Sequence, residues 1–125
     1  MNRLFFVIGC FLASTGVLMG AVAAHSLEKT LPALLFHSFE TAAKYQLVGA
    51  TFLLVTGIAN SHLHFLTGKI AGWMGLVGVI LFSGSLYAYS LSEIKFLVYI
   101  TPFGGILMIS AWLVLGWSAI KKVNL

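Results

Sequence analysis

The chain has 125 residues, of which 60% are hydrophobic and 8% are charged, with a formal net charge of +4 and one cysteine. Soluble domains carry about 25% charged residues, so this composition excludes a soluble globular enzyme, a disordered chain and a disulfide-stabilised scaffold. It predicts an integral membrane protein.

Four windows of 23 to 25 residues contain no charged side chain: residues 4–27, 45–68, 70–92 and 96–120. A hydrocarbon core of about 30 Å needs about 20 helical residues, so each window is long enough for one crossing. Helices are favoured because every backbone N–H and C=O in lipid must bond within the protein. The predicted fold is an all-α integral membrane four-helix bundle. It forms a single domain over residues 1–125, with helices at about 4–27, 32–60, 68–90 and 96–120.

The first predicted helix, 4–27, is expected to remain uncleaved. The apolar run before Cys10 is shorter than the core of a signal peptide, and the run continues to Ala24. Gly16 and Gly20 are four residues apart, a spacing that lets another helix approach closely. That helix belongs either to this chain, the interpretation we favour, or to a second copy.

The segment 28–44 is the most polar part of the chain. A helix start is predicted at Thr30-Leu31-Pro32, because proline fits the first turn of a helix. Four polar residues then share one helical face: His37, Glu40, Thr41 and Lys44. The pattern predicts an amphipathic start to the second helix at the membrane interface. Glu40 either turns into the mouth of the bundle, as we expect, or pairs with Lys44 outside it.

Glycines and a proline mark the last two predicted helices, 68–90 and 96–120. Gly84, Gly104 and Gly105 are expected to permit close contact between these helices. Pro102 predicts a kink in the first turns of the fourth helix, because proline lacks a backbone N–H and crowds the carbonyl four residues before it.

Four crossings place both termini on one side of the membrane. That side, called side A, carries Arg3, Lys69, Lys121 and Lys122, and the opposite side, side B, carries Lys29, Lys44 and Lys95. The positive-inside rule favours side A as cytoplasmic. We therefore expect a multi-pass protein of the bacterial inner membrane with both termini in the cytoplasm. The basic residues are dispersed, so no nucleic-acid partner is expected.

Polar residues from all four predicted helices fall in the side B half of the membrane. The candidate polar cluster consists of His25, Glu40, Tyr45, Gln46, Ser83, Ser85, Tyr87 and Thr101. Such convergence is expected of a binding site, a relay or a gate. A structural cap that satisfies helix ends would use the same residues, and both interpretations stay open. The sequence has no catalytic motif, phosphate loop or metal-ligand spacing, so we expect no catalytic residue, metal or cofactor.

Four short motifs carry a resemblance to a known family: GAVAAH at 20–25, AKYQ at 43–46, FSGSLY at 82–87 and TPFGG at 101–105. In this order and spacing the chain resembles the small bacterial membrane proteins of the domain of unknown function 423 family, which has a distant animal transmembrane relative. The resemblance implies a four-helix membrane protein with no assigned activity. Gly49 stands where family members carry a histidine, which argues against histidine-based chemistry here.

Three classes of function remain, in order of preference. The first is an accessory or scaffold protein that packs in the membrane against a larger complex. The second is an oligomeric small transporter, channel or ligand-binding bundle that uses the polar cluster. The third is a membrane enzyme acting on a lipid or quinone, and we expect no enzyme. The expected partners are the lipid bilayer and either further copies of the chain or a larger membrane complex.

Overall fold

The computed structural model describes residues 1–123, and within this range the chain forms helices and short connections without a strand. The helical elements are α1 (Arg3–Val22), a π-helical turn (Ala23–Leu27), α2 (Glu28–Thr30), α3 (Ala33–Ile58), a 3-10 turn (Ala59–His62), α4 (Phe65–Ser92), a 3-10 turn (Lys95–Tyr99) and α5 (Thr101–Val123). They form four helical spans long and apolar enough to cross a membrane: Arg3–Thr30, Ala33–His62, Phe65–Ser92 and Lys95–Lys122. The predicted all-α membrane four-helix fold is confirmed. The predicted domain runs to residue 125, and its last two residues lie outside the described range.

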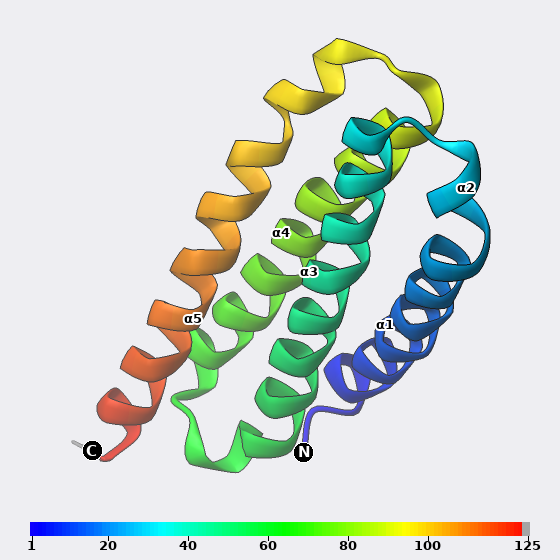
Figure 1. Cartoon of the computed structure of the whole chain (residues 1–125). Helices are drawn as coiled ribbons and strands as arrows, with labels where there is room; N and C mark the ends of the chain where they lie inside the picture. Colours follow the sequence, from blue (N-terminus) through cyan, green and yellow to red (C-terminus); the bar gives the residue numbers. More distant parts are fainter. Residues whose placement is uncertain (124–125) are drawn as a thin grey trace.

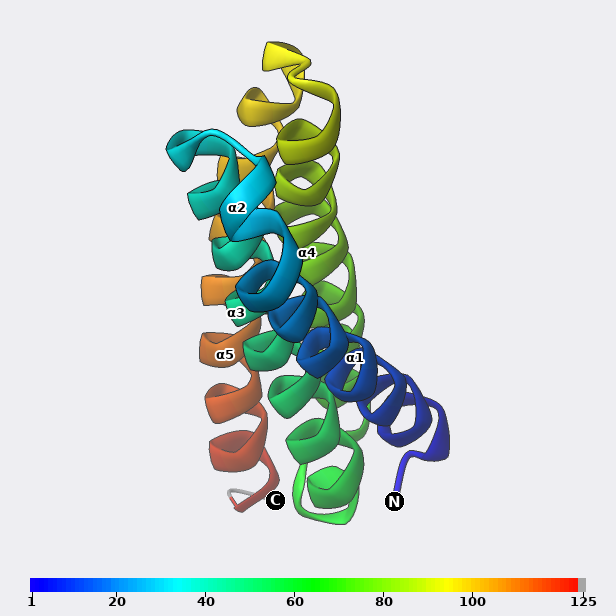
Figure 2. The same cartoon turned by 45° about the vertical axis from the view of Figure 1, so that its right-hand side comes forward.

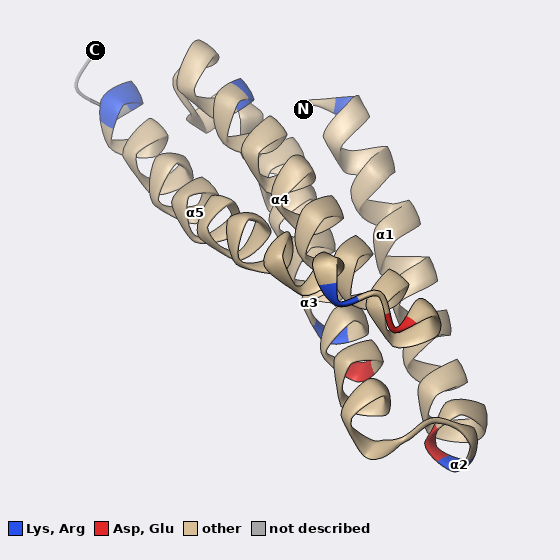
Figure 3. Ribbon diagram, turned by 90° about the horizontal axis from the view of Figure 1, so that it is seen from above, with Lys and Arg blue, Asp and Glu red and all other residues tan. Residues whose placement is uncertain are grey.

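The four long helices pack largely in chain order (Figure 1). α1 packs against α3, α3 against α4 and α4 against α5, so α1 and α5 are the outer helices. α1 crosses the other helices at an angle (Figure 2). The start of α1, the α3–α4 connection and the end of α5 lie at one end of the bundle (Figure 1). Charged residues gather toward the two ends and leave the middle apolar, as a membrane requires (Figure 3).

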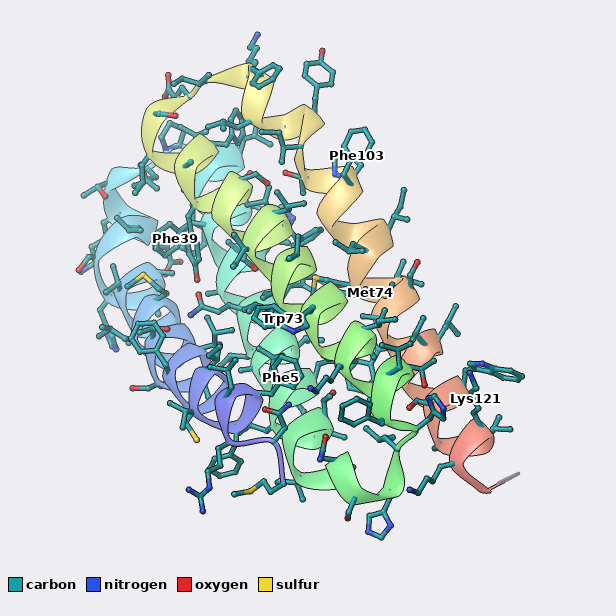
Figure 4. All side chains as sticks on the ribbon, turned by 180° about the vertical axis from the view of Figure 1, so that it is seen from behind. Phe5, Phe39, Trp73, Met74, Phe103 and Lys121 are labelled. Carbon is teal, nitrogen blue, oxygen red and sulfur yellow. The ribbon has the colours of Figure 1, made fainter. Side chains whose placement is uncertain are left out.

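The main apolar core lies in the side A half of the bundle. It consists of Phe5, Phe52, Leu53, Leu63, Ala71, Ala111 and Leu115. The Phe5 ring lies where a side chain on Gly72 would be, so the absence of a Cβ there lets α1 reach α4. The same ring packs edge-on against Trp73 with ring centroids 5.6 Å apart (Figure 4). Phe52 of α3 and Trp112 of α5 form a second edge-on pair at 4.8 Å, which joins the central and outer helices.

The polar connection between the first two spans is more helical than the sequence indicates. The first span continues from α1 through the π-helical turn into α2 and ends at Thr30, three residues beyond the predicted end at about 27. Pro32 is the N-cap of α3, where its missing N–H leaves no intrahelical hydrogen bond unmade.

Pro102 is the second residue of α5, and only Ile100 and Thr101 separate it from the 3-10 turn Lys95–Tyr99. The chain therefore changes from 3-10 to α geometry just before the proline, at the point where the sequence predicts a kink. A proline at this position loses no hydrogen bond, because the first turn of a helix has no intrahelical acceptor for its N–H groups.

Two glycines expected at helix contacts do not lie there. A Cβ added to Gly20 or Gly84 would meet no atom within 4 Å. Successive helical residues are about 100° apart, and Gly84 lies between one serine that bonds to α3 and another that bonds to α5. It therefore faces neither helix. By contrast, Gly16 lies against Leu47, and Gly105 lies against the Phe82 ring.

Candidate functional site

Gln46 is the centre of a polar network that joins three helices. Its side chain is only 6% exposed on α3. Its Nε2 donates to the Leu12 carbonyl oxygen at 3.0 Å and to Thr15 Oγ1 at 2.6 Å, both on α1. Its Oε1 accepts from the Tyr87 hydroxyl of α4 at 2.6 Å. We call Thr15, Gln46, Tyr87 and the Leu12 carbonyl the Gln46 network.

Tyr87 is held in place by an aromatic neighbour as well as by Gln46. Its ring packs edge-on against Phe39 of α3, with centroids 4.9 Å apart. Phe39 is buried, so the Tyr87 hydroxyl has little freedom to leave the glutamine. The network is therefore a fixed arrangement of donors and acceptors.

Two serines of α4 bond to different helices. Ser83 donates its hydroxyl to the Ala42 carbonyl oxygen of α3 at 2.8 Å. The hydroxyls of Ser85 and Thr101 share a hydrogen bond of 2.5 Å, which joins α4 to α5. Interhelical hydrogen bonds of this kind fix helix packing in membranes.

A cavity of about 280 Å³ lies between α1 and α4 beside the Gln46 network. We call it the α1–α4 cavity; it is lined by Phe11, Leu12, Thr15, Gln46, Val79, Ile80, Ser83, Gly84 and Tyr87. Its rim residues Phe11, Ile80 and Gly84 are exposed and belong to the charge-free windows 4–27 and 70–92, so the cavity opens on the part of the bundle that a membrane would surround with lipid.

Two further hollows lie on the other faces of the bundle, and both have mainly apolar walls. One, of about 300 Å³, is lined by Tyr45, Val48, Phe82, Gly105, Met108, Ile109 and Trp112. The other, of about 500 Å³, is lined by Leu66, Lys69, Ile70, Trp73, Met74, Val77 and Leu107. Trp73 and Met74 lie close together on α4 in Figure 4. Neither hollow reaches the Gln46 network, so the α1–α4 cavity is the candidate site.

The structure brings together only part of the predicted polar cluster. Gln46, Ser83 and Tyr87 line the α1–α4 cavity, and Ser85 with Thr101 forms a separate pair. Tyr45 lies outside this site and packs edge-on against Phe82 at 5.0 Å. His25 is exposed near the end of the first span.

The expectation that Glu40 turns into the bundle mouth is wrong. Its side chain is exposed, and no hydrogen bond within residues 1–123 involves it. Phe39, Ala42 and Ala43 occupy the buried face of α3 at this level, so the stripe containing Glu40 faces outward. Glu40 is therefore not a site residue.

Thr15 is the residue that sequence reasoning missed. Its hydroxyl donates to the Phe11 carbonyl oxygen at 2.9 Å and accepts from Gln46. The available signal was its position, since it is the one threonine in the apolar window 4–27. In that setting a hydroxyl is more often bonded to its own helix, which gave no reason to pair it with Gln46.

The chemistry that this arrangement can perform is recognition by hydrogen bonding. The Gln46 network contains no carboxylate, imidazole or thiol. Among the described residues, no group of three or more histidine, cysteine, aspartate or glutamate side chains is placed to hold a metal ion.

Comparison with known proteins relates the chain to a family of unknown function. A family model described as "Protein of unknown function (DUF423)" matches residues 19–105. A UPF0382 membrane protein of Staphylococcus haemolyticus is 36% identical over 122 residues, covering 98% of this chain and 99% of the relative. The UPF0382 membrane protein YwdK of Bacillus subtilis is 34% identical over 121 residues, covering 95% and 98%. A UPF0382 membrane protein of Haemophilus influenzae is 35% identical over 112 residues, covering 87% of each chain. No solved structure matches the chain.

Proposed function

The chain belongs to the DUF423 family of proteins of unknown function, as its motifs indicate, and for it we propose the role of an accessory or scaffold protein. In this role its single four-helix domain packs in the membrane against a larger membrane complex. The observation that carries the proposal is the outer face of α1. Four residues on one line of that face are exposed, and three of them are small: Cys10, Ser14, Val17 and Ala21.

Large exposed side chains such as Phe11 and Leu18 flank this line on α1, so it is the line of small residues, and not the whole face of α1, that differs from the outer face of α5. The outer face of α5 carries large exposed side chains: Phe103, Ile106, Ile109, Leu113 and Trp117. Large side chains fill the space between lipid chains, whereas small ones let two helices approach closely. The contrast supports α1 as the helix that packs against a partner and α5 as a lipid-facing helix.

Purification in a gentle detergent, followed by native mass spectrometry, tests the accessory role. We expect a partner at fixed stoichiometry. Ser14→Leu should release it because the added side chain holds the helices apart. Gly116→Leu is the matched control, since it places the same leucine side chain on α5 at an exposed position with no atom within 4 Å of a Cβ. Loss of the partner in both variants, or no partner with the unaltered chain, would contradict the proposal.

A second candidate function is a ligand-binding bundle, alone or as an oligomeric transporter or channel. The α1–α4 cavity favours it, because an apolar cavity beside a few fixed polar groups is the usual form of a small-molecule site. The network supplies no acid, base or nucleophile, so the candidate function is binding or transport rather than catalysis.

We also propose that side A is cytoplasmic and the membrane is the bacterial inner membrane. Side A carries four Lys and Arg residues against three on side B, and these counts support the orientation. Single cysteines in a Cys10→Ser background test it with a membrane-impermeant maleimide on intact cells. We expect Ile94→Cys to react directly. Asn2→Cys and Asn124→Cys, the latter outside the described residues, should react only after permeabilisation.

Two outcomes of the labelling would contradict different parts of this topology. Reaction of Asn2→Cys and Asn124→Cys in intact cells, with Ile94→Cys protected, would reverse the orientation. Reaction of the two terminal positions from opposite sides would contradict four crossings.

A further inference from the structure

The walls of the α1–α4 cavity have already used their hydrogen-bond donors. The two N–H groups of Gln46 bond to the Leu12 carbonyl and to Thr15. The Thr15 hydroxyl donates to the Phe11 carbonyl, the Tyr87 hydroxyl to Gln46 and the Ser83 hydroxyl to the Ala42 carbonyl. Within residues 1–123, no buried side-chain nitrogen or oxygen lacks a partner.

The same walls retain unused acceptors. A hydroxyl oxygen and an amide carbonyl oxygen each accept two hydrogen bonds. Gln46 Oε1 accepts one bond, from Tyr87, so it has one lone pair left. No hydrogen bond in the described part of the chain uses the acceptor capacity of Tyr87 Oη or Ser83 Oγ. Only a small part of the cavity wall is polar, and the free hydrogen-bonding capacity of that part consists of acceptors.

From this imbalance we infer that the α1–α4 cavity binds a neutral, membrane-dissolved amphiphile through a hydroxyl group that donates to Tyr87, Gln46 or Ser83. A ligand headed by a carbonyl or an ether would have to take a proton donor from an existing bond. That exchange would leave a buried group of the protein unpaired. A charged head is disfavoured because no charged side chain lines the cavity to compensate its lost hydration.

The rest of the cavity fits an apolar chain. Phe11, Leu12, Val79 and Ile80 supply hydrocarbon walls. A volume of about 280 Å³ corresponds to roughly nine waters at about 30 Å³ each, which is enough for a head group and a short length of chain. The remainder of the ligand would leave through the rim at Gly84 into the lipid. A long-chain alcohol has this form.

This inference rests on the ligand-binding candidate and is independent of the accessory role. Its test uses the full chain in phosphatidylcholine nanodiscs with a photoreactive hexadecanol as the probe, and mass spectrometry locates the labelled peptide. We expect saturable labelling of the α1 or α4 wall that hexadecanol displaces. Hexadecyl methyl ether has the same chain and an acceptor but no donor, so it should compete at least tenfold less effectively.

Two variants show whether the label reports this cavity. Gly84→Leu places a side chain at the rim, where a Cβ meets no atom within 4 Å, so it should block the probe without unfolding the bundle. Gly116→Leu on α5 has the same open surroundings and should label normally. Equal thermal stability of both variants in the same nanodiscs confirms that each is folded.

The outcomes distinguish a failure of this inference from a failure of the ligand-binding candidate on which it rests. Equal competition by the ether would overturn the donor requirement and leave a ligand-binding bundle. Undiminished labelling of Gly84→Leu would assign the ligand to another surface and overturn the proposed site. Absence of any saturable labelling would overturn both the inference and the ligand-binding candidate.

Discussion

Gly104→Ala should destabilise the protein by about 1–3 kcal/mol, although it adds only one methyl group. A Cβ at this position would lie against the Phe82 amide nitrogen, 2.8 Å from the Gly78 carbonyl oxygen and 2.9 Å from the Leu81 carbonyl carbon. These are backbone atoms of α4, so no side chain can rotate away and α5 must move. Thermal or SDS-induced unfolding in detergent, followed by circular dichroism, measures the loss.

Gly116→Ala on the same helix provides the control. No atom lies within 4 Å of a Cβ there, and alanine favours a helix over glycine by up to about 1 kcal/mol. We expect this variant to be as stable as the unaltered chain or slightly more so. The difference in unfolding free energy between the two variants therefore gives the cost of the closer helix contact, without the contribution of helix propensity. If Gly104→Ala matched Gly116→Ala, then α4 and α5 would not approach as closely as described.

The four spans could be predicted because charge is costly in lipid, so charge-free windows mark membrane crossings directly. The ends of the spans were harder to predict. Through the π-helical turn Ala23–Leu27 the first span extends past the charged pair Glu28-Lys29. No periodic pattern in the sequence predicts such a turn. Likewise α4 begins at Phe65, before the predicted 68, because the His64 ring caps the helix by accepting from the Thr67 amide.

The sequence could predict how deep in the membrane each candidate site residue lies, but not which way its side chain points around the helix axis. Sequence position gives the level of a residue along a helix, and this placed Gln46, Ser83 and Tyr87 together correctly. It does not give rotation about the axis, which side-chain packing decides. Glu40 and Gln46 are six residues apart, so their side chains point about 120° apart around α3 and do not share a face. This angle could have been read from the sequence, and it separates the buried glutamine from the exposed carboxylate.

Gln46→Leu should have the second large effect on stability. It removes two hydrogen bonds to α1 and one from Tyr87. Interhelical hydrogen bonds in membrane proteins contribute about 0.6 kcal/mol on average and up to about 1.7 kcal/mol, so three of them amount to roughly 2–5 kcal/mol. Leucine fills a similar volume, which keeps the loss from being a cavity effect. Tyr45→Phe serves as the control, since no hydrogen bond in the described part of the chain involves this exposed hydroxyl.

A double-mutant cycle separates a true network from three independent bonds. Tyr87→Phe alone should cost about 0.6–1.7 kcal/mol, the value of one interhelical bond. Combined with Gln46→Leu it should cost almost nothing further, because the partner of Tyr87 is already gone and its hydroxyl would otherwise be left unpaired beside leucine. The single and double variants are compared by unfolding in the same detergent. Strict additivity would mean that Tyr87 is stabilised by Phe39 and by its surroundings rather than by Gln46. The fixed acceptor pattern of the α1–α4 cavity would then lose its physical basis.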